Sequence, residues 1–344
     1  MSPIMTSIIV SSLATGTIIT ASSYHWLLAW IGLEINTLAI IPLISKMHHP
    51  RATEAATKYF LTQATASALI LFSSTINAQQ TGSWDILQLT TPQSTILLTM
   101  ALALKLALAP THFWLPEVLQ GSTMMTAMII STWQKLAPMT IIYLVADNLQ
   151  TTVLLTLGIT STLVGGWAGL NQTQTRKIMA YSSIAHLGWI TTISFLLKNI
   201  MLLSLTIYIV LSTSMFSTLI LSNSKTIKDT MTSWTTSISL TTMSLMILLS
   251  LGGLPPLTGF APKWLILEEL IAQKLTTAAS IMAAATLLSL FFYLRLTYTT
   301  ALTSPPTTFS STYKWRFRMS NLTLLITMTG PIALLILPIT PMLM

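Results

Sequence analysis

Six titratable side chains lie inside long apolar stretches of this sequence, where charge is costly. They are one carboxylate, three amines and two imidazoles: Glu34, Lys105, Lys135, Lys263, His112 and His186. On insertion scales a charged side chain at the middle of a bilayer costs about 2.5–3.5 kcal/mol, so the glutamate and the three lysines together cost about 10 kcal/mol or more. This energetic cost is close to the stability of a whole domain, which indicates that the charges have a function. Titratable groups in series are suited to carrying protons.

Two opposing effects on charge would let these groups exchange protons. Burial disfavours the charged form of an amine or a carboxylate, whereas a neighbouring opposite charge favours it. A lysine that is desolvated and only intermittently paired can therefore load and release a proton, and Glu34 is the expected partner of Lys105. The alternative is that these charges pair with one another only to pack a helix bundle.

Two histidines can extend such a path, since imidazole changes its charge between about pH 5 and 8. His112 follows Pro110 in a broken stretch, which favours hydration. His186 lies in SSIAHLGW, with Ser182 and Ser183 within one helical turn. Each histidine is either a proton relay or a core residue with satisfied hydrogen bonds.

The segment that must position Lys263 is an apolar run from about Ile238 to Ala272, too long for one plain membrane helix and too short for two with a turn. Three prolines interrupt it: Pro255, Pro256 and Pro262. Because proline lacks an amide hydrogen, the carbonyls of Leu251, Gly252 and Thr258 are expected to lose their helical partners. In lipid such carbonyls are tolerated only inside protein or beside water, so this break predicts an internal polar site.

Composition places the chain in a membrane. Of 344 residues, 52% are hydrophobic and 7% charged, with a mean hydropathy of +0.73, whereas soluble domains carry about 25% charged residues. We expect an all-α polytopic membrane protein, since the long apolar runs are unlike the short alternating segments of a β-barrel. The absence of cysteine excludes disulfides and iron–sulfur ligation, and no metal site is expected. The basic residues behind the net charge of +8 are scattered along the sequence, which argues against nucleic-acid binding.

About eleven transmembrane helices fit this length. Their approximate bounds are Pro3–Ser23, Tyr24–Ser45, Thr53–Ala78, Ser94–Gln120, Thr123–Ala146, Thr151–Leu170, Lys177–Leu197, Ile200–Leu221, Ile238–Ala272, Thr276–Tyr298 and Leu322–Met342. The fourth and ninth spans are over-long, interrupted by proline and carry a central lysine, and their separation by five spans makes them run in opposite directions. We therefore expect two inverted five-helix repeats, 1–146 and 147–300, followed by a loop and a C-terminal helix in 301–344.

The distribution of basic residues predicts the orientation. With the N-terminus inside, the inside loops hold Lys46, Arg51, Arg176, Lys177, Lys225, Lys228, Lys314, Arg316 and Arg318, and the outside loops hold Lys198 and Lys274. This positive-inside bias supports one broken helix, rather than two helices, between Ile238 and Ala272. The first residues, MSPIMTSIIV, contain no basic or amphipathic presequence, so insertion during synthesis is expected.

Four segments resemble one known family. They are GGLPPLTGFAPKW (Gly252–Trp264), HFWLPEVLQG (His112–Gly121), AYSSIAHLGW (Ala180–Trp189) and WIGLEINTLAIIPLI (Trp30–Ile44). They are similar to the chain 2 family of mitochondrial NADH–ubiquinone oxidoreductase, and the similarity extends over essentially the whole chain. It implies a core, antiporter-like subunit of the membrane arm of respiratory complex I. The family's functional groups then correspond to these residues: Glu34, Lys105, Lys135, Lys263 and the central His186.

The same resemblance implies redox-coupled proton translocation from the mitochondrial matrix to the intermembrane space by a chain without its own redox centre. NAD, FMN, iron–sulfur clusters and ubiquinone would then be bound by other subunits. The implied partners are the other membrane-arm subunits and membrane lipids, including cardiolipin. The chain would lie in the mitochondrial inner membrane, with the N-terminus in the matrix and the C-terminus in the intermembrane space.

The residues themselves leave two rival functions open. A stand-alone cation/proton antiporter would need carboxylates to bind sodium, and Glu34 is the one acidic residue expected deep in the membrane against three lysines. A purely structural membrane scaffold is the other rival, and in that case conservative removal of the buried charges would improve stability.

Overall fold

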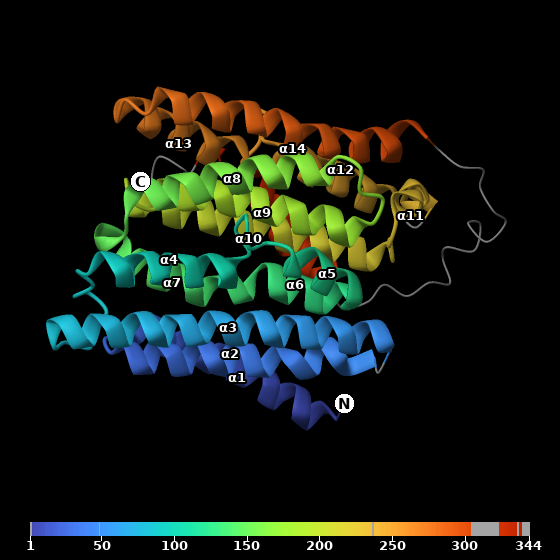
Figure 1. Ribbon diagram of the computed structural model, residues 1–344. Helices are drawn as coiled ribbons and strands as arrows, with labels where there is room; N and C mark the ends of the chain where they lie inside the picture. The colour runs from blue at the N-terminus through green and yellow to red at the C-terminus, as the bar shows by residue number, and fades with distance from the viewer. Residues whose placement is uncertain (1, 48, 236, 304–322, 336, 339–344) are drawn as a thin grey trace. The chain divides into compact units, whose positions relative to one another are not determined.

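The computed structural model describes residues 2–47, 49–235, 237–303, 323–335 and 337–338, and most of these residues are helical (Figure 1). Seven of the described helical segments are long and apolar enough to cross a membrane, and Ile238–Gly252 and Thr323–Leu335 are shorter apolar helices. Among the described residues, β-structure is confined to two isolated bridges. The prediction of an all-α membrane protein is therefore confirmed.

The backbone divides into two compact units, Met1–Ser161 with Ser194–Lys198, and Thr162–Ile193 with Asn199–Met344. The first boundary, after Ser161, falls within α8 (Thr151–Gly169). The first unit contains these further elements: α1 (Pro3–Ser22), α2 (Trp26–Ile44), η1 (Ser45–Met47), α3 (Pro50–Thr81), α4 (Pro92–Leu106), α5 (Trp114–Gly121), α6 (Met124–Ser131), η2 (Trp133–Lys135), α7 (Leu136–Val145) and η3 (Ala146–Asn148).

Helices α1 and α2 pack closely because glycines face each other across their contact. A Cβ atom on Gly16 would lie 2.9 Å from the carbonyl oxygen of Gly32, and one on Gly32 would lie 2.8 Å from the carbonyl oxygen of Gly16. A Cβ on Gly16 would also lie 2.4 Å from Oδ1 of Asn36. Small residues of this kind let membrane helices approach, and here they also leave room for a buried amide.

The predicted break in the fourth span is present. α4 ends at Leu106, Ala107 is left-handed with φ 61°, and α5 begins only at Trp114. Pro110 lies in the gap and cannot continue the helix. Pro116 does not interrupt the helix, because it lies in the first turn of α5, where a missing amide is tolerated.

The fifth span is not the plain helix that was predicted, because η2 interrupts it between α6 and α7. Pro138 explains this difference. It has no amide to donate to the carbonyl of Gln134, and its ring would clash with that carbonyl in a regular helix. Lys135 therefore lies where the backbone changes from a 3-10 turn to an α-helix, not in the middle of a regular helix.

The second unit contains the end of α8 and these elements: α9 (Thr175–Ile193), most of α10 (Lys198–Leu221), α11 (Ile227–Met231), η4 (Ser233–Thr235), α12 (Ile238–Gly252), α13 (Phe260–Ala272), α14 (Thr276–Leu302) and α15 (Thr323–Leu335). The bounds of the predicted spans agree with the helices to within about four residues where both ends are described. The predicted basic loop at 314–318 and the end of the last predicted span lie outside the described residues.

The second break separates α12 from α13, as predicted. The chain leaves α12 through Gly253, whose φ of 81° is left-handed. Gly259 allows the closest approach, because a Cβ there would lie 1.8 Å from the carbonyl oxygen of Ser250. Pro262 cannot donate to the carbonyl of Thr258, and this carbonyl instead accepts from the amide of Ala261 at 3.3 Å, in a tighter turn.

Candidate functional site

Lys105 and Lys135 line one cavity in the first unit. Lys105 lies in the last turn of α4 and Lys135 at the end of η2, and their exposed fractions are 4% and 0%. The other polar or aromatic side chains that line this cavity come from three helices and from η2: Asn36, Thr37, Tyr59, Gln63, Trp114 and Gln134. The helix break thus brings two buried amines to one polar space.

The break also supplies the partner of Lys135. Its Nζ donates to the carbonyl oxygen of Leu106 at 2.6 Å. In an unbroken helix that carbonyl would accept from residue 110, but Pro110 has no amide hydrogen. The Lys135 Nζ also lies 5.5 Å from the ring centroid of Trp114, a cation–π distance. The indole of Trp114 in turn donates to the carbonyl of Leu104 at 3.0 Å.

The second unit repeats this arrangement with different elements. Pro256 frees the carbonyl of Gly252, the last residue of α12. The Nζ of Lys263 donates to that carbonyl at 3.0 Å. The prediction that this carbonyl loses its helical partner is therefore confirmed, and the group that replaces the amide is the lysine itself.

Glu34 and Lys105 are not joined by an ion pair in this structure. Among the described residues, Oε2 of Glu34 and Nζ of Lys105 have no hydrogen-bond partner. An unpaired state is one of the two states that a switchable pair requires. The proposed exchange between paired and unpaired forms stays a prediction.

His186 and Lys263 line one cavity in the second unit, together with Tyr208 and Ser204. The Nε2 of His186 lies 3.4 Å from the hydroxyl oxygen of Tyr293, and its ring centroid lies 5.7 Å from that of Tyr208. The histidine is thus enclosed by two tyrosines and shares its cavity with the lysine of the second break.

Tyr208 and Tyr293 are the residues that the sequence reasoning missed. Both are buried, and their hydroxyl groups interact with Ser183 and Ser182, respectively. The two serines within one helical turn of His186 thus interact with the tyrosines beside it. The available signal was a tyrosine in the middle of an apolar span, because a buried tyrosine hydroxyl needs a partner.

His112 lies in the gap between α4 and α5 and is 6% exposed. Its ring packs against Phe113 with centroids 4.3 Å apart, and its carbonyl accepts from the amide of Leu115 at 3.1 Å. It is not among the residues that line the cavity with Lys105 and Lys135. The predicted relay role of His112 therefore lacks the shared space that the two lysines have.

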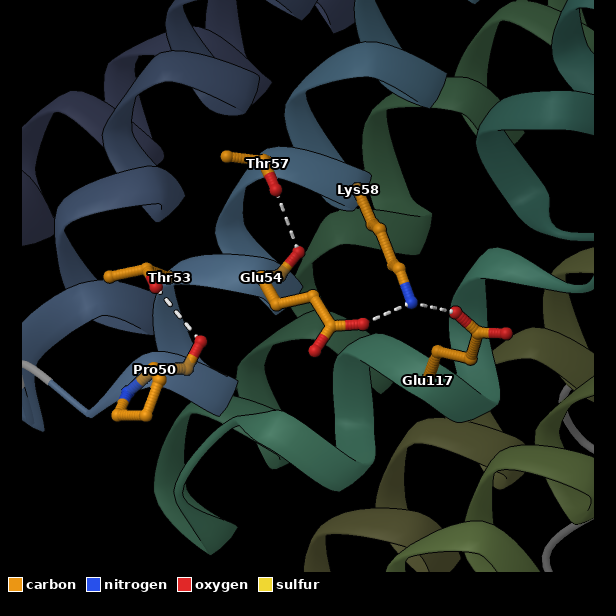
Figure 2. Close-up of polar contacts among 6 residues, drawn as sticks. All are labelled: Pro50, Thr53, Glu54, Thr57, Lys58 and Glu117. Carbon is orange, nitrogen blue, oxygen red and sulfur yellow. Dashed lines mark hydrogen bonds and ion pairs between the residues drawn. The ribbon is translucent and has the colours of Figure 1, made fainter.

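Figure 2 shows an ion cluster in which Lys58 lies between two carboxylates. Its Nζ lies 2.5 Å from Glu54 Oε1 on the same helix and 2.6 Å from Glu117 Oε2 on α5. Glu54 and Lys58 have the i,i+4 spacing that pairs side chains on one helix face, and Glu117 joins α5 to α3. All three side chains are partly exposed, so this cluster ties the piece of helix after the break to its neighbour at modest energy.

Comparison with known proteins defines the class to which this fold and site belong. Residues 23–289 match the family described as the transmembrane part of NADH:quinone oxidoreductase and the Mrp antiporter, and residues 290–344 match the C-terminus of NADH dehydrogenase subunit 2. A chain of respiratory complex I from Thermus thermophilus is 27% identical, with a TM-score of 0.80 over 96% of this chain and 78% of that one. A chain of the Mrp complex from Dietzia shares the fold at 17% identity, with a TM-score of 0.77 over 87% of this chain and 61% of that one.

Curated relatives narrow the class to one subunit. NADH-ubiquinone oxidoreductase chain 2 of Xenopus laevis is 56% identical over 99% of both chains. The protein of the same name from Oncorhynchus mykiss is 55% identical over 99% of this chain and 98% of its own length. The chain belongs to the NADH-ubiquinone oxidoreductase chain 2 family.

Proposed function

We propose that this chain is a core subunit of the membrane arm of respiratory complex I and that it translocates protons while the complex reduces ubiquinone. The family membership and the structural similarity to a chain of a bacterial complex I support this assignment over a stand-alone antiporter. One observation carries the proton path. In each unit, a lysine donates to a carbonyl that a proline has freed at a helix break; Lys135 is fully buried and Lys263 is partly buried.

The proposed path in the first unit runs through Glu34, Lys105 and Lys135. A change of charge elsewhere in the complex pairs Glu34 with Lys105 or separates them, and this changes the affinity of Lys105 for its proton. Lys105 and Lys135 exchange the proton through the cavity that they share. The carbonyl of Leu106 stabilises Lys135 when it is charged, because a freed carbonyl is a strong acceptor.

In the second unit, the proposed path runs through His186 and Lys263, with the carbonyl of Gly252 in the same stabilising role. Tyr208 and Tyr293 fix the position of the imidazole. His112 is retained as a candidate at the first break, where proline-interrupted backbone favours hydration.

The chemistry of electron transfer is assigned to other subunits. The chain has no cysteine, so it offers no thiolate for an iron–sulfur cluster. We infer that NAD, FMN, iron–sulfur clusters and ubiquinone bind elsewhere in the complex. The role of this chain in the NADH:ubiquinone reductase is then proton transport that is coupled to the electron transfer.

The proposed location is the mitochondrial inner membrane. The excess of lysine and arginine in alternate loops supports an N-terminus in the matrix and a C-terminus in the intermembrane space. The two matching proline-interrupted spans, one in each half, support two inverted five-helix repeats, 1–146 and 147–300. The other membrane-arm subunits and lipids, including cardiolipin, are the proposed partners.

The proton path is tested by replacing Lys105 or Lys263 with methionine in the assembled complex. Methionine keeps the length of the apolar stem and removes the titratable amine, so we expect assembly and NADH oxidation in the presence of an uncoupler to be retained. The number of protons moved per electron pair in reconstituted vesicles should fall. Lys228→Met is the matched control, because Lys228 is an exposed lysine on α11. An unchanged ratio in both Lys105→Met and Lys263→Met would refute the proton path.

A further inference from the structure

Gln63 is a buried amide whose position the proposed proton path does not yet explain. It lies in the middle of α3, is 4% exposed, and lines the cavity that contains Lys105 and Lys135. Its Nε2 has no hydrogen-bond partner among the described residues, and the Nζ of Lys105 is likewise without one. A buried polar atom without a partner lowers the stability of the protein, so an apolar residue would be more stable at this position unless the amide has a function.

The two amines in this cavity do not contact each other directly. Lys105 Nζ has no hydrogen-bond partner among the described residues, and Lys135 Nζ donates to the carbonyl of Leu106. A proton needs a continuous line of hydrogen bonds, so something must connect the two groups. A water molecule suits the space, which contains several polar side chains and has room for about one water.

An amide is suited to holding such a water because it does not titrate. Its N–H donates to the water oxygen and fixes that atom in place, while the two hydrogens of the water stay free to point at a neutral amine. A carboxylate at this position would pair with the ammonium of Lys105 and keep it charged. A hydrocarbon would leave the water with too few polar partners to stay.

We propose that Gln63 holds a water molecule in this cavity and that this water carries the proton between Lys105 and Lys135. The step balances without any other reactant. The ammonium of Lys105 gives a proton to the water oxygen, the water gives one of its own hydrogens to the neutral amine of Lys135, and the water is regenerated. Gln63 is a positioning residue in this scheme, since it exchanges no proton itself, and the inference rests on the proposed function.

The test compares two variants of α3 in the assembled complex. Gln63→Met removes the amide at nearly constant volume. Ser67→Ala is the control one turn further along, because the hydroxyl of Ser67 is buried but already donates to the carbonyl of Ala64 at 2.9 Å. We expect proton transfer through this chain to slow by about tenfold or more in Gln63→Met, with the uncoupled oxidation of NADH retained, and to be unchanged in Ser67→Ala.

A high-resolution density map of the unmodified complex gives a second readout that does not depend on activity. We expect a water peak within hydrogen-bond distance of both Gln63 Nε2 and Lys105 Nζ, and we expect Gln63→Met to lose it. A map without this peak would overturn the proposal, even where Gln63→Met fails to assemble. Normal proton pumping in Gln63→Met, with pumping lost in Lys105→Met, would also overturn it and leave the proposed function standing. Normal pumping in both Lys105→Met and Lys263→Met would instead remove the proposed function.

Discussion

At the scale of single residues, a proline and a lysine act together to keep a charge in the interior of each unit. Proline frees the carbonyl four residues before it, and the lysine amine takes the place of the missing amide, at Leu106 in the first unit and Gly252 in the second. An ammonium that donates to a carbonyl in a water-poor interior makes a stronger bond than it would in water. The same break that weakens the helix therefore stabilises the charge.

The sequence predicts these lysines because charge in an apolar run is conspicuous and proline marks the break. It does not predict which carbonyl receives each lysine, since the acceptor of Lys135 lies 29 residues away in the chain. It also does not predict that Tyr208 and Tyr293 lie around His186, because a tyrosine in a span indicates a hydroxyl that needs a partner but not which side chain it lies beside.

Gly259 offers a test of the second break at this scale. Its φ is −67°, so its backbone suits any residue, and its role is the close approach to the carbonyl oxygen of Ser250. A Cβ 1.8 Å from that oxygen must displace backbone, and we expect Gly259→Ala to destabilise the chain by about 3 kcal/mol or more. The measurement is the amount of chain in the assembled complex. Gly330→Ala is the control, since a Cβ there would lie 4.0 Å from the nearest neighbour, Met243. Equal amounts of the two variants in the complex would contradict this account.

At the scale of elements, helix bounds were largely predictable because apolar runs end at polar or proline-containing loops. The exception is the interruption at η2. Pro138 was visible in the sequence, but a proline inside a membrane helix either kinks it or is accommodated by neighbours, and the sequence does not distinguish these outcomes. Glu117 illustrates the same limit, since its bond to Lys58 depends on where α5 lies after the break.

Helix α11 gives the pH-dependent prediction, because it is a short helix outside the spanning segments. Burial raises the pKa of Asp229, but hydrogen bonds from the amides of Thr226 and Lys225 outweigh this and lower the pKa below its ordinary value of 3.8. These bonds are 2.8 and 3.0 Å long and form part of a capping box. Because the folded-state pKa is the lower one, the stabilisation is complete above about pH 4 and is lost as the pH falls through the folded-state value.

We therefore expect Asp229→Asn to weaken α11 by about 0.5–1 kcal/mol near neutral pH, at the low end for a helix cap. The reason is that a neutral amide oxygen accepts more weakly than a carboxylate. Hydrogen exchange of the segment 225–231, followed by mass spectrometry, should show less protection in the variant at pH 7 and a shrinking difference as the pH approaches 3. A difference that stays constant over this range would show that the charge of Asp229 is not the cause.

At the scale of the whole chain, the sequence predicts a membrane protein with one broken span in each half, and the structure has both breaks, one within each compact unit. The inverted relation of the two halves stays a prediction, as do the eleven spans and the sides on which the termini lie. Periodicity and loop charge indicate only indirectly the direction in which each helix crosses the membrane. This inference depends on the loops, and the basic loop at 314–318 lies outside the described residues.

The last prediction concerns the assembly in which the chain works. The sequence predicts one carboxylate near the middle of the spans, Glu34, against the amines Lys105, Lys135 and Lys263, and this balance suits proton exchange better than coordination of a metal cation. Protons moved this way need an energy source, and the chain has no thiolate for an iron–sulfur centre of its own. After extraction with a mild detergent, we expect the chain to migrate on a native gel in the large band that oxidises NADH. A stronger detergent, as the control, should release it from that band, whereas migration as a small oligomer under mild conditions would favour a stand-alone cation/proton antiporter.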